Sequence, residues 1–388
     1  MSQQSRTLSD ALPPSVEPKN SAMSIFSKTS AFLGISALRD LVTDSMAIDM
    51  GTANTIIAVN GRDVVLDEPS LIAVNELTNE LVAFGQEAYE MRGREARDVK
   101  VIAPLIGGVV ADFERTKQML AHFVTKGRSG VSQFSRRAVM SVISEITHVE
   151  QRALLDAVES AHVGKVFMME EGLAAAFGAG ISPHDKRASA VVDIGSSTTN
   201  IAVVANGTIV HSRSERLGSS SINAAIINHV RRHRGLAIGD ETAEKLKLEV
   251  VSATLPTDIG FEIMIRGRDV QTGSPGAVTI TAGELYPVAE GIIRRVSNSV
   301  NQALTELGPE VAADIYDRGI ILTGGGALFS GIESYMRART KLPVLVADEP
   351  RYSAVRGLLQ MFNQPMLLRR VARNEPHLLS DADIPFEV

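Results

Sequence analysis

Two short segments of the sequence each place an aspartate close to a glycine and small polar residues. Asp49 is followed by Gly51, and Asp193 is followed by Gly195. Glycine lets a backbone approach a phosphate closely, and consecutive backbone N–H groups in a turn bind anions. Mg²⁺ keeps most of its waters and meets proteins through a few carboxylates. The two segments therefore suit a site for a polyphosphate and a metal ion, which both aspartates contact through water.

Hydroxyl and amide side chains follow each aspartate and can contact phosphate oxygens. A single Asp-x-Gly-Thr segment is usually an ordinary turn, but two copies in equivalent surroundings indicate a binding site. The first copy contains Thr52, Asn54 and Thr55, and the second contains Ser196, Ser197, Thr198 and Thr199.

Two further segments carry residues suited to nucleotide chemistry. Gly324-Gly325-Gly326 follows an apolar stretch, and backbone without side chains can lie against a purine or an α-phosphate. An ordinary strand-to-helix turn is the other interpretation. Glu171 stands at the start of a predicted helix. It either orients an attacking water in phosphoryl transfer or only stabilises the positive end of the helix dipole.

The elements that must position these residues form an internal repeat. Ala47–Gly61 and Val191–Gly207 both run from an apolar strand through Asp-x-Gly into a second apolar strand, and both end in Asn-Gly. Asn-Gly between apolar runs is the strongest short-range signal for a β-hairpin. The recurrence predicts a duplicated domain.

Strands and helices alternate after each copy of the repeat. This alternation predicts an α/β fold with helices packed on mixed sheets, and one helix has a capping box at its start. The predicted strands are Ala138–Ile143, Val166–Met169 and Gly319–Thr323, the capping box is Thr147 with Glu150, a helix is predicted from Glu170 to Ala179, and residues 222–287 resemble an inserted subdomain.

The composition excludes several classes of protein. The chain has 388 residues, a net charge of -6 and no cysteine. The length favours two domains, and the acidic balance argues against a nucleic-acid partner. Without cysteine there is no disulfide scaffold, thiolate metal site or cysteine nucleophile. No stretch reaches the roughly 20 apolar residues that cross a bilayer.

The two ends of the chain differ from its body. Residues 1–22 are polar, contain proline and lack periodicity, which predicts a disordered tail. The stretch from about Arg373 is likewise predicted to be a loose tail. Residues 24–42 are rich in apolar side chains but contain only Lys28 and Arg39 as basic residues. They form either a helix packed on the body or an interfacial helix at a membrane surface.

The order of these motifs resembles that of the actin-like ATPases, most closely the bacterial MreB family. AIDMGTANTIIAVNGRDVVLDEPSLIAV, GGVVADF, AAAFGAG, AIINHVRRH, ETAEKLKLEV, RGRD and LTGGGAL all resemble MreB segments, from about Met46 to about Leu358. The resemblance implies an actin-like fold in which two duplicated domains enclose a nucleotide cleft. It also implies ATP and Mg²⁺ as cofactors, homopolymer filaments, and a cytoplasmic position at the inner membrane beside membrane proteins that guide cell shape and wall synthesis.

The resemblance further implies roles for single residues. Glu171 and Thr198 are the catalytic candidates, and Asp49 and Asp193 are the Mg²⁺ candidates. The positions that match the nucleotide contacts are Gly51, Thr52, Ala53 and Asn54 in the first phosphate motif, Gly195, Ser196, Ser197, Thr198 and Thr199 in the second, Glu244 and Lys247 near the nucleoside, and Gly324, Gly325, Gly326 and Ala327 near the adenosine.

Each domain of the family has a large and a small subdomain, and the resemblance implies where they lie. Residues 46–73, 106–186 and 350–372 form subdomain IA, 74–105 form IB, 187–222 and 288–349 form IIA, and 223–287 form IIB. Residues 1–45 remain as an N-terminal tail with a membrane-associating helix, and 373–388 as a C-terminal tail.

The sequence departs from the family pattern in four places. Ser196-Ser197 stand where glycines are usual, Gly172 where proline is usual, and Asn200 where an acidic residue is usual; Gly218-Ser219-Ser220 replaces Gly-Gly-Asp. The serines add bulk beside the γ-phosphate, and Gly172 loosens the start of the helix that carries Glu171. We therefore predict ATP binding with slow or partner-dependent hydrolysis.

Other members of the same superfold define the alternatives. A non-polymerising adaptor or chaperone-type ATPase would bind partner proteins as a monomer. A filament of the MamK type would position an organelle. A sugar or acetate kinase needs a catalytic base and a polar substrate pocket, and neither is legible in the sequence.

Overall fold

A computed structural model describes residues 45–127, 135–144, 146–161 and 163–373. The predictions for residues 1–22 and 24–42 and for the tail beyond Arg373 lie outside these residues. Within them, no helix is both long and apolar enough to cross a membrane.

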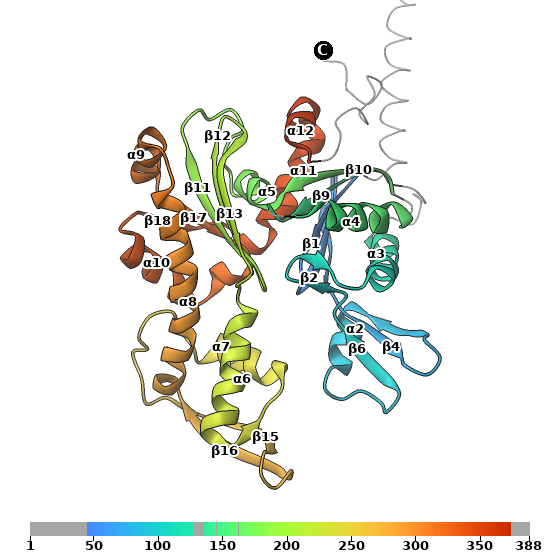
Figure 1. Cartoon of the computed structure of the whole chain (residues 1–388), viewed down its shortest axis with the longest axis vertical. Coiled ribbons are helices and arrows are strands. Elements are labelled where there is room, and N and C mark those ends of the chain that lie inside the picture. The colour runs from blue at the N-terminus through green and yellow to red at the C-terminus, as the bar shows by residue number, and fades with distance from the viewer. Residues whose placement is uncertain (1–44, 128–134, 145, 162, 374–388) are drawn as a thin grey trace, which may run out of the picture. The chain divides into compact units, whose positions relative to one another are not determined.

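A five-stranded mixed sheet organises the first half of the described chain (Figure 1). The first three strands pair antiparallel, and β9 and β10 then add in parallel beside β1. Its central strands are buried on both faces, as their nearly continuous apolar runs predict. The order is β10-β9-β1-β2-β3, with β1 at Ser45–Met50, β2 at Asn54–Val59, β3 at Asp63–Pro69, β9 at Ser135–Val142 and β10 at Val163–Glu170.

A second five-stranded sheet repeats this arrangement. Its first three strands are again antiparallel, and the last two add in parallel on the other side of the first. The order is β13-β12-β11-β17-β18, with β11 at Ser189–Ile194, β12 at Thr199–Ala205, β13 at Thr208–Glu215, β17 at Ile320–Thr323 and β18 at Val344–Val346.

The predicted duplication is confirmed by details of the two sheets. The register shifts once in each second hairpin, between Ile57 and Ala58 and between Val203 and Val204. Both Asn-Gly pairs form turns in which the glycine has a positive φ. The two halves therefore share strand order, strand direction and the position of a bulge.

Helices cover the outer faces of both sheets. On the first sheet the capping box is confirmed, because the Thr147 hydroxyl accepts from the Glu150 amide and the Glu150 carboxylate accepts from the Thr147 amide. On the second sheet the helices share one core with its strands. The covering helices are α3 (Phe113–Gly127) and α4 (His148–Ser160) on the first sheet and α8 (Ala282–Thr305), α9 (Pro309–Arg318) and α10 (Ile332–Thr340) on the second.

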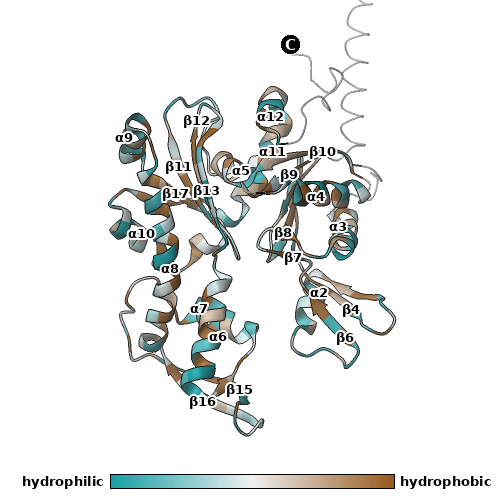
Figure 2. Ribbon diagram, in the orientation of Figure 1, coloured by the Kyte–Doolittle hydropathy of each residue, from teal (hydrophilic) through white to brown (hydrophobic). Residues whose placement is uncertain are grey.

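Two helices lie between the sheets and join them. Helices α5 (Glu171–Gly178) and α11 (Ser353–Gln360) share one buried core with strands of both sheets. Helix α5 follows the edge strand β10, and α11 follows the corresponding edge strand β18 of the second sheet. The two helices are therefore equivalent members of the repeat. In Figure 2 their ribbons lie between the two sheets and are partly apolar.

Small residues let α5 and α11 touch backbone to backbone. A Cβ on Gly178 would lie 1.7 Å from the Ser353 carbonyl oxygen, and a Cβ on Gly357 would lie 1.8 Å from the Ala174 carbonyl oxygen. Each helix therefore presents a small residue and a glycine four positions later, and only that spacing allows this crossing.

Each half also carries a small three-stranded sheet. The first half adds β4 (Ile72–Asn75), β5 (Leu81–Phe84), β6 (Val99–Ile102), α2 (Gly85–Met91) and the short pair β7 (Leu105–Ile106) and β8 (Val109–Val110). The second half adds α6 (Ser220–Arg234), β14 (Leu236–Ala237), α7 (Asp240–Glu249), β15 (Glu262–Asp269) and β16 (Pro275–Thr281). Helix α12 (Pro365–Val371) and short 3₁₀ turns at Gly325–Leu328, Pro350–Tyr352 and Met361–Asn363 complete the described elements.

Arg373 at the end of the described chain returns to the first sheet. Its amide donates to the Met168 carbonyl at 2.8 Å, and its guanidinium pairs with Glu170 at 3.0 Å. Glu170 is buried and also accepts from the Ser144 hydroxyl. These contacts hold the end of β10 immediately before Glu171.

The close crossing of α5 and α11 predicts a sharp effect of adding one methyl group. We expect Gly357→Ala to lower stability by about 3 kcal/mol or more, because the added carbon meets backbone atoms that cannot move aside. The midpoint of thermal unfolding measures this.

Gly291→Ala is the matched control, since Gly291 lies within α8 and a Cβ there meets nothing within 4 Å. This change is expected to stabilise the helix by about 0.5–1 kcal/mol. Equal midpoints for the two variants would show that the helix crossing is not tight.

Candidate functional site

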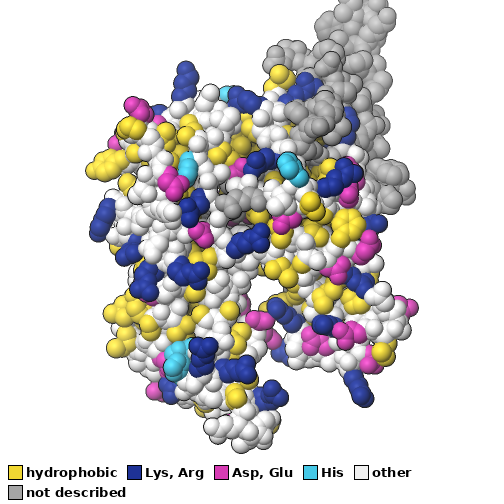
Figure 3. Space-filling model, viewed as in Figure 1, with side chains coloured by type: hydrophobic (Ala, Val, Ile, Leu, Met, Phe, Trp, Pro, Cys, Tyr) yellow, Lys and Arg dark blue, Asp and Glu magenta, His cyan; other side chains and the backbone are white. Residues whose placement is uncertain are grey.

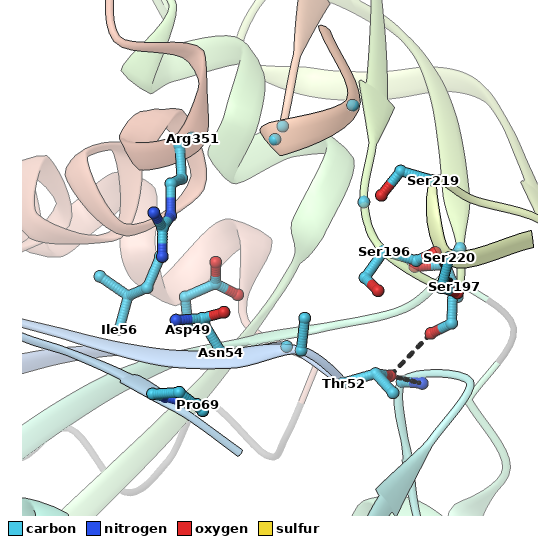
Figure 4. A pocket seen from close by; sticks show the side chains of 18 of the residues that line it. Asp49, Thr52, Asn54, Ile56, Pro69, Ser196, Ser197, Ser219, Ser220 and Arg351 are labelled. Carbon is cyan, nitrogen blue, oxygen red and sulfur yellow. Dashed lines mark hydrogen bonds between the residues drawn. The ribbon is translucent and has the colours of Figure 1, made fainter. Parts of the chain in front are cut away.

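A single large pocket lies between the two halves and has a volume of about 670 Å³. On the face drawn in Figure 3, the surface is hollowed between the lobe with α6 and α7 and the lobe with α2. Both Asp-x-Gly loops line the pocket, one at the end of β1 and the other at the end of β11. The duplicated segments therefore face one pocket from opposite sides (Figure 4).

The loop after β1 is held by hydroxyl groups from neighbouring strands. The Ser141 hydroxyl donates to Asp49 at 2.6 Å, and the Ser70 hydroxyl donates to the Gly51 carbonyl at 2.7 Å. A Cβ on Gly51 would lie 2.7 Å from the Asn54 carbonyl oxygen. Glycine is therefore required for this turn, and the Asp49 carboxyl is fixed at the pocket wall.

The loop after β11 has the same construction. The Thr323 hydroxyl donates to the Asp193 carboxylate at 2.8 Å, and the Gly195 amide donates to the Thr198 carbonyl at 2.9 Å. Asp193 is only 4% exposed. The neighbouring strand thus orients the aspartate in each half, although Ser141 does so in one and Thr323 in the other.

Glu171 begins α5, lines the pocket with both aspartates and shares a side-chain hydrogen bond with Asp193. Asn200 donates its side-chain N–H to Glu171 at 2.8 Å, and Ser214 donates its hydroxyl to the Asn200 carbonyl oxygen at 2.7 Å. Because a carboxylate only accepts, these bonds fix which way the Asn200 amide points. Asn200 therefore orients one oxygen of Glu171.

The three acids share one electrostatic environment. Burial raises the pKa of Asp49 above its usual value and raises the pKa of Asp193 to about 6. Burial, with the charges of Asp193 and Asp49, raises the pKa of Glu171 well above its usual range. No lysine or arginine is among the groups that shift these three pKa values. Burial and the proximity of the three acids therefore favour their uncharged forms when no cation is bound.

The glycine run after β17 lies against the loop after β11. Gly324 has φ +78, and a Cβ there would meet the Ile194 carbonyl oxygen at 2.5 Å. A Cβ on Gly326 would meet the Ile194 side chain at 2.4 Å, whereas Gly325 faces open space. Packing thus requires two of the three glycines, and the third leaves bare backbone at the pocket.

A polar cluster from α6 and α7 lines the pocket in the second half. Glu244 accepts from Lys247 at 2.7 Å and from the Asn223 side-chain N–H at 2.6 Å. Lys247 is 6% exposed and pairs with Glu244, so its charge is compensated. The cluster presents a fixed set of polar groups to a ligand.

Two exposed ion pairs join the segment after α2 to the start of α7, and both residues of the first pair line the pocket. Arg92 pairs with Asp240 at 2.8 Å, and Arg94 pairs with Glu241 at 2.7 Å. Exposed pairs contribute little free energy, about 0–1 kcal/mol each. They link the lobe with α2 to the lobe with α7, and breaking them would require little free energy.

Most of the residues predicted from sequence line this pocket, and two do not. The Thr199 hydroxyl is buried and donates to the Leu217 carbonyl, and Ala327 is 3% exposed in the core of the second half. Thr199 begins strand β12 and follows the pocket-lining Thr198, whereas Ala327 lies in the 3₁₀ turn Gly325–Leu328 and packs into the core. The pocket is lined by Asp49, Gly51, Thr52, Ala53, Asn54, Glu171, Asp193, Gly195, Ser196, Ser197, Thr198, Glu244, Lys247, Gly324, Gly325 and Gly326.

Sequence reasoning missed several residues of the pocket lining. Gly108 lies in a motif of the family resemblance, and Ser219 and Ser220 stand at a recognised departure, so a signal existed for these three. Nothing in the sequence pattern marks Ser141 or Arg351, which reach the pocket from distant strands and turns.

The acidic cluster is suited to a divalent cation. Asp49 and Asp193 line the pocket from opposite halves, and no lysine or arginine is among the groups that shift their pKa values. Among the described residues, no group of three or more His, Asp or Glu could hold a metal by itself. An ion here would therefore share its coordination with water and with a bound phosphate, as Mg²⁺ prefers.

Duplicated sheets around a pocket lined by two Asp-x-Gly loops define an actin-like ATPase fold. The model of the MreB/Mbl protein family matches residues 43–370, and the chain belongs to this family. The cell shape-determining protein MreB of Escherichia coli (strain K12) is 38% identical over 324 residues, which cover 82% of this chain and 93% of that protein. The cell shape-determining protein Mbl of Bacillus subtilis (strain 168) is 39% identical over 306 residues, covering 79% and 91%.

Solved structures show the same fold. MreB5 of Spiroplasma citri bound to AMPPNP has a TM-score of 0.78 and 31% identity, covering 84% of this chain and 97% of that one. A MamK double helical filament has a TM-score of 0.69 at 20% identity, covering 83% and 99%. The second likeness concerns the fold alone.

The raised pKa of Asp193 predicts that, without nucleotide, ionised Asp193 lowers the free energy of unfolding. A carboxyl with pKa about 6 when folded and 3.8 when unfolded destabilises the protein progressively as pH rises through this range, and fully above pH 6. We expect Asp193→Asn to stabilise the nucleotide-free protein at pH 8 by about 2 kcal/mol. The gain should disappear below pH 4.

Thermal unfolding of both proteins from pH 4 to pH 8 measures this difference. The same variant should lose the stabilisation that Mg-ATP confers on the unmodified protein. A variant less stable than the unmodified protein at pH 8 would contradict the electrostatic account.

Proposed function

We propose that this chain is an ATP-binding cytoskeletal protein that forms filaments and determines cell shape. The observation that carries the proposal is that two duplicated Asp-x-Gly loops face one pocket from opposite halves. The named relatives support it, because they are cell shape-determining proteins aligned over 79–82% of this chain.

Several groups in the pocket suit the parts of ATP. The loops around Thr52 and Ser196 offer hydroxyl and backbone donors to phosphate oxygens. Glu244 and Lys247 suit the nucleoside, and Gly325 offers flat backbone beside it. The MreB5 structures bound to AMPPNP and to ADP support a nucleotide in this position.

Asp49 and Asp193 would hold Mg²⁺ through water, and the ion would neutralise charge on the phosphate oxygens. Glu171 lines the pocket with these aspartates, accepts from Asn200 and shares a side-chain hydrogen bond with Asp193. We propose that a metal ion at the aspartates frees Glu171 from this bond to accept from a water. A water held this way is oriented for attack on the terminal phosphate. Thr198 is buried beside the same loop and supports its backbone. ATP hydrolysis is therefore part of the proposal, at a slow rate.

Filament formation follows from head-to-tail contact between copies. A heterologous interface that does not close generates a filament. Since the pocket lies between two halves, a bound nucleotide can change their relative position and so change the free energy of that interface. We propose that ATP favours the polymer and that hydrolysis weakens it.

The remaining expectations complete this proposal. The filament works in the cytoplasm at the inner membrane surface, with membrane proteins of a morphogenetic complex as partners. The apolar segment 24–42 is the proposed membrane contact. The proposed subdomains are IA (46–73, 106–186 and 350–372), IB (74–105), IIA (187–222 and 288–349) and IIB (223–287).

The position of Glu171 predicts a separation of binding from turnover. We expect Glu171→Ala to keep ATP affinity within about threefold and to lower phosphate release at least tenfold, because the carboxyl proposed to orient the water is removed while both Asp-x-Gly loops remain. Calorimetry and a phosphate-release assay measure the two quantities. Unchanged turnover would show that another group orients the water.

Nucleotide-dependent assembly is the direct test of the filament. Mg-ATP should raise light scattering and the sedimented fraction of the purified protein, and Mg-ADP should raise them less. A monomer in Mg-ATP at every salt concentration would instead favour a non-polymerising adaptor ATPase. An ADP release that depends on an added sugar or acetate would point to a kinase.

A further inference from the structure

A hydroxyl pair joins the two phosphate loops directly. The Ser197 hydroxyl donates to the Thr52 hydroxyl oxygen at 2.7 Å, which links residues 145 positions apart in the sequence (Figure 4). The Gly108 amide, in the turn between β7 and β8, donates to the same Thr52 oxygen at 2.9 Å. Three separate segments therefore meet at one oxygen atom in the pocket wall.

The hydrogen-bond count at Thr52 has a direct consequence. A hydroxyl has two acceptor lone pairs and one donor hydrogen. Ser197 and Gly108 occupy both lone pairs, so the Thr52 hydrogen is the only part of the group left to bond. Donation into an oxygen also polarises its O–H and strengthens it as a donor. Thr52 is thus prepared to donate to an acceptor in the pocket.

The position of Thr52 in the pocket indicates which part of a ligand accepts its hydroxyl hydrogen. The groups suited to the nucleoside, around Glu244 and Gly325, all belong to the second half, whereas Thr52 belongs to the first. A nucleotide whose nucleoside is held at those groups would extend its phosphate chain toward the first half, where Thr52 lies. Phosphate oxygens at neutral pH accept hydrogen bonds, which matches the remaining Thr52 hydrogen.

We propose that Ser197 determines the preference of this pocket for a nucleoside triphosphate over a diphosphate, acting through Thr52. Glycine at position 197 would leave one Thr52 lone pair free, and the hydroxyl hydrogen would no longer be directed. A γ-phosphate benefits from the directed donor and a β-phosphate does not reach it. Ser197 is therefore a positioning residue, and this inference rests on the proposed nucleotide-binding function.

Paired affinity measurements test the proposal. Calorimetry with Mg-AMPPNP and with Mg-ADP is carried out on the unmodified protein and on Ser197→Ala, Ser197→Thr and Ser182→Ala. Ser182 is an exposed serine outside the pocket, and its replacement is the matched control. Thermal unfolding without nucleotide verifies that every variant is folded.

We expect Ser197→Ala to weaken Mg-AMPPNP binding about tenfold and to change Mg-ADP binding less than twofold. Ser197→Thr keeps the hydroxyl and should restore the preference, and Ser182→Ala should leave both affinities unchanged. Equal losses for the two nucleotides, or no loss for either, would overturn the proposal. If the unmodified protein binds neither nucleotide, the proposed function itself fails.

Discussion

The backbone contact between α5 and α11 is the constraint on which the rest of the structure depends. Gly178 and Gly357 have no side chains to separate the two helices, so the halves meet through a close-packed layer instead of a flexible linker. Helix α5 begins with Glu171, and the crossing therefore also sets where this carboxyl lies relative to Asp49 and Asp193. The same duplicated element joins the two halves, but it carries a pocket-lining carboxyl, that of Glu171, in only one of them.

Three buried acids in the pocket are unfavourable in their charged forms, and a bound cation would lower that free energy. Asp49, Glu171 and Asp193 are held by hydrogen bonds in a region that disfavours their charged forms. A metal-bound polyphosphate brings the missing positive charge in its cation, and the loop amides receive the phosphate oxygens. In the function proposed above, such binding would stabilise one arrangement of the two halves and so couple the nucleotide to assembly.

The departures from the family pattern have specific structural surroundings. Gly172 does not only loosen a helix start, because a Cβ there would lie 2.7 Å from the Ala202 Cβ, and its absence lets α5 pack against β12. Asn200 donates to Glu171, which an acidic residue could do only if protonated. Ser197 adds a hydroxyl bridge between the phosphate loops. Each change adjusts the contacts of the pocket without altering the sheets around it.

The sequence alone determined the duplication, the Asp-x-Gly turns, the Asn-Gly hairpins and the Thr147 capping box, because turn chemistry and periodicity act over a few neighbouring residues. With the family resemblance, it also predicted 16 of the 37 residues that line the pocket. Only the tertiary structure decided that Ser141, 92 positions from Asp49, would orient that aspartate, and that Thr199 would face a core. Such contacts depend on how strands and helices pack, and a side chain that alternates between faces cannot be assigned to a pocket until the neighbouring elements are in place.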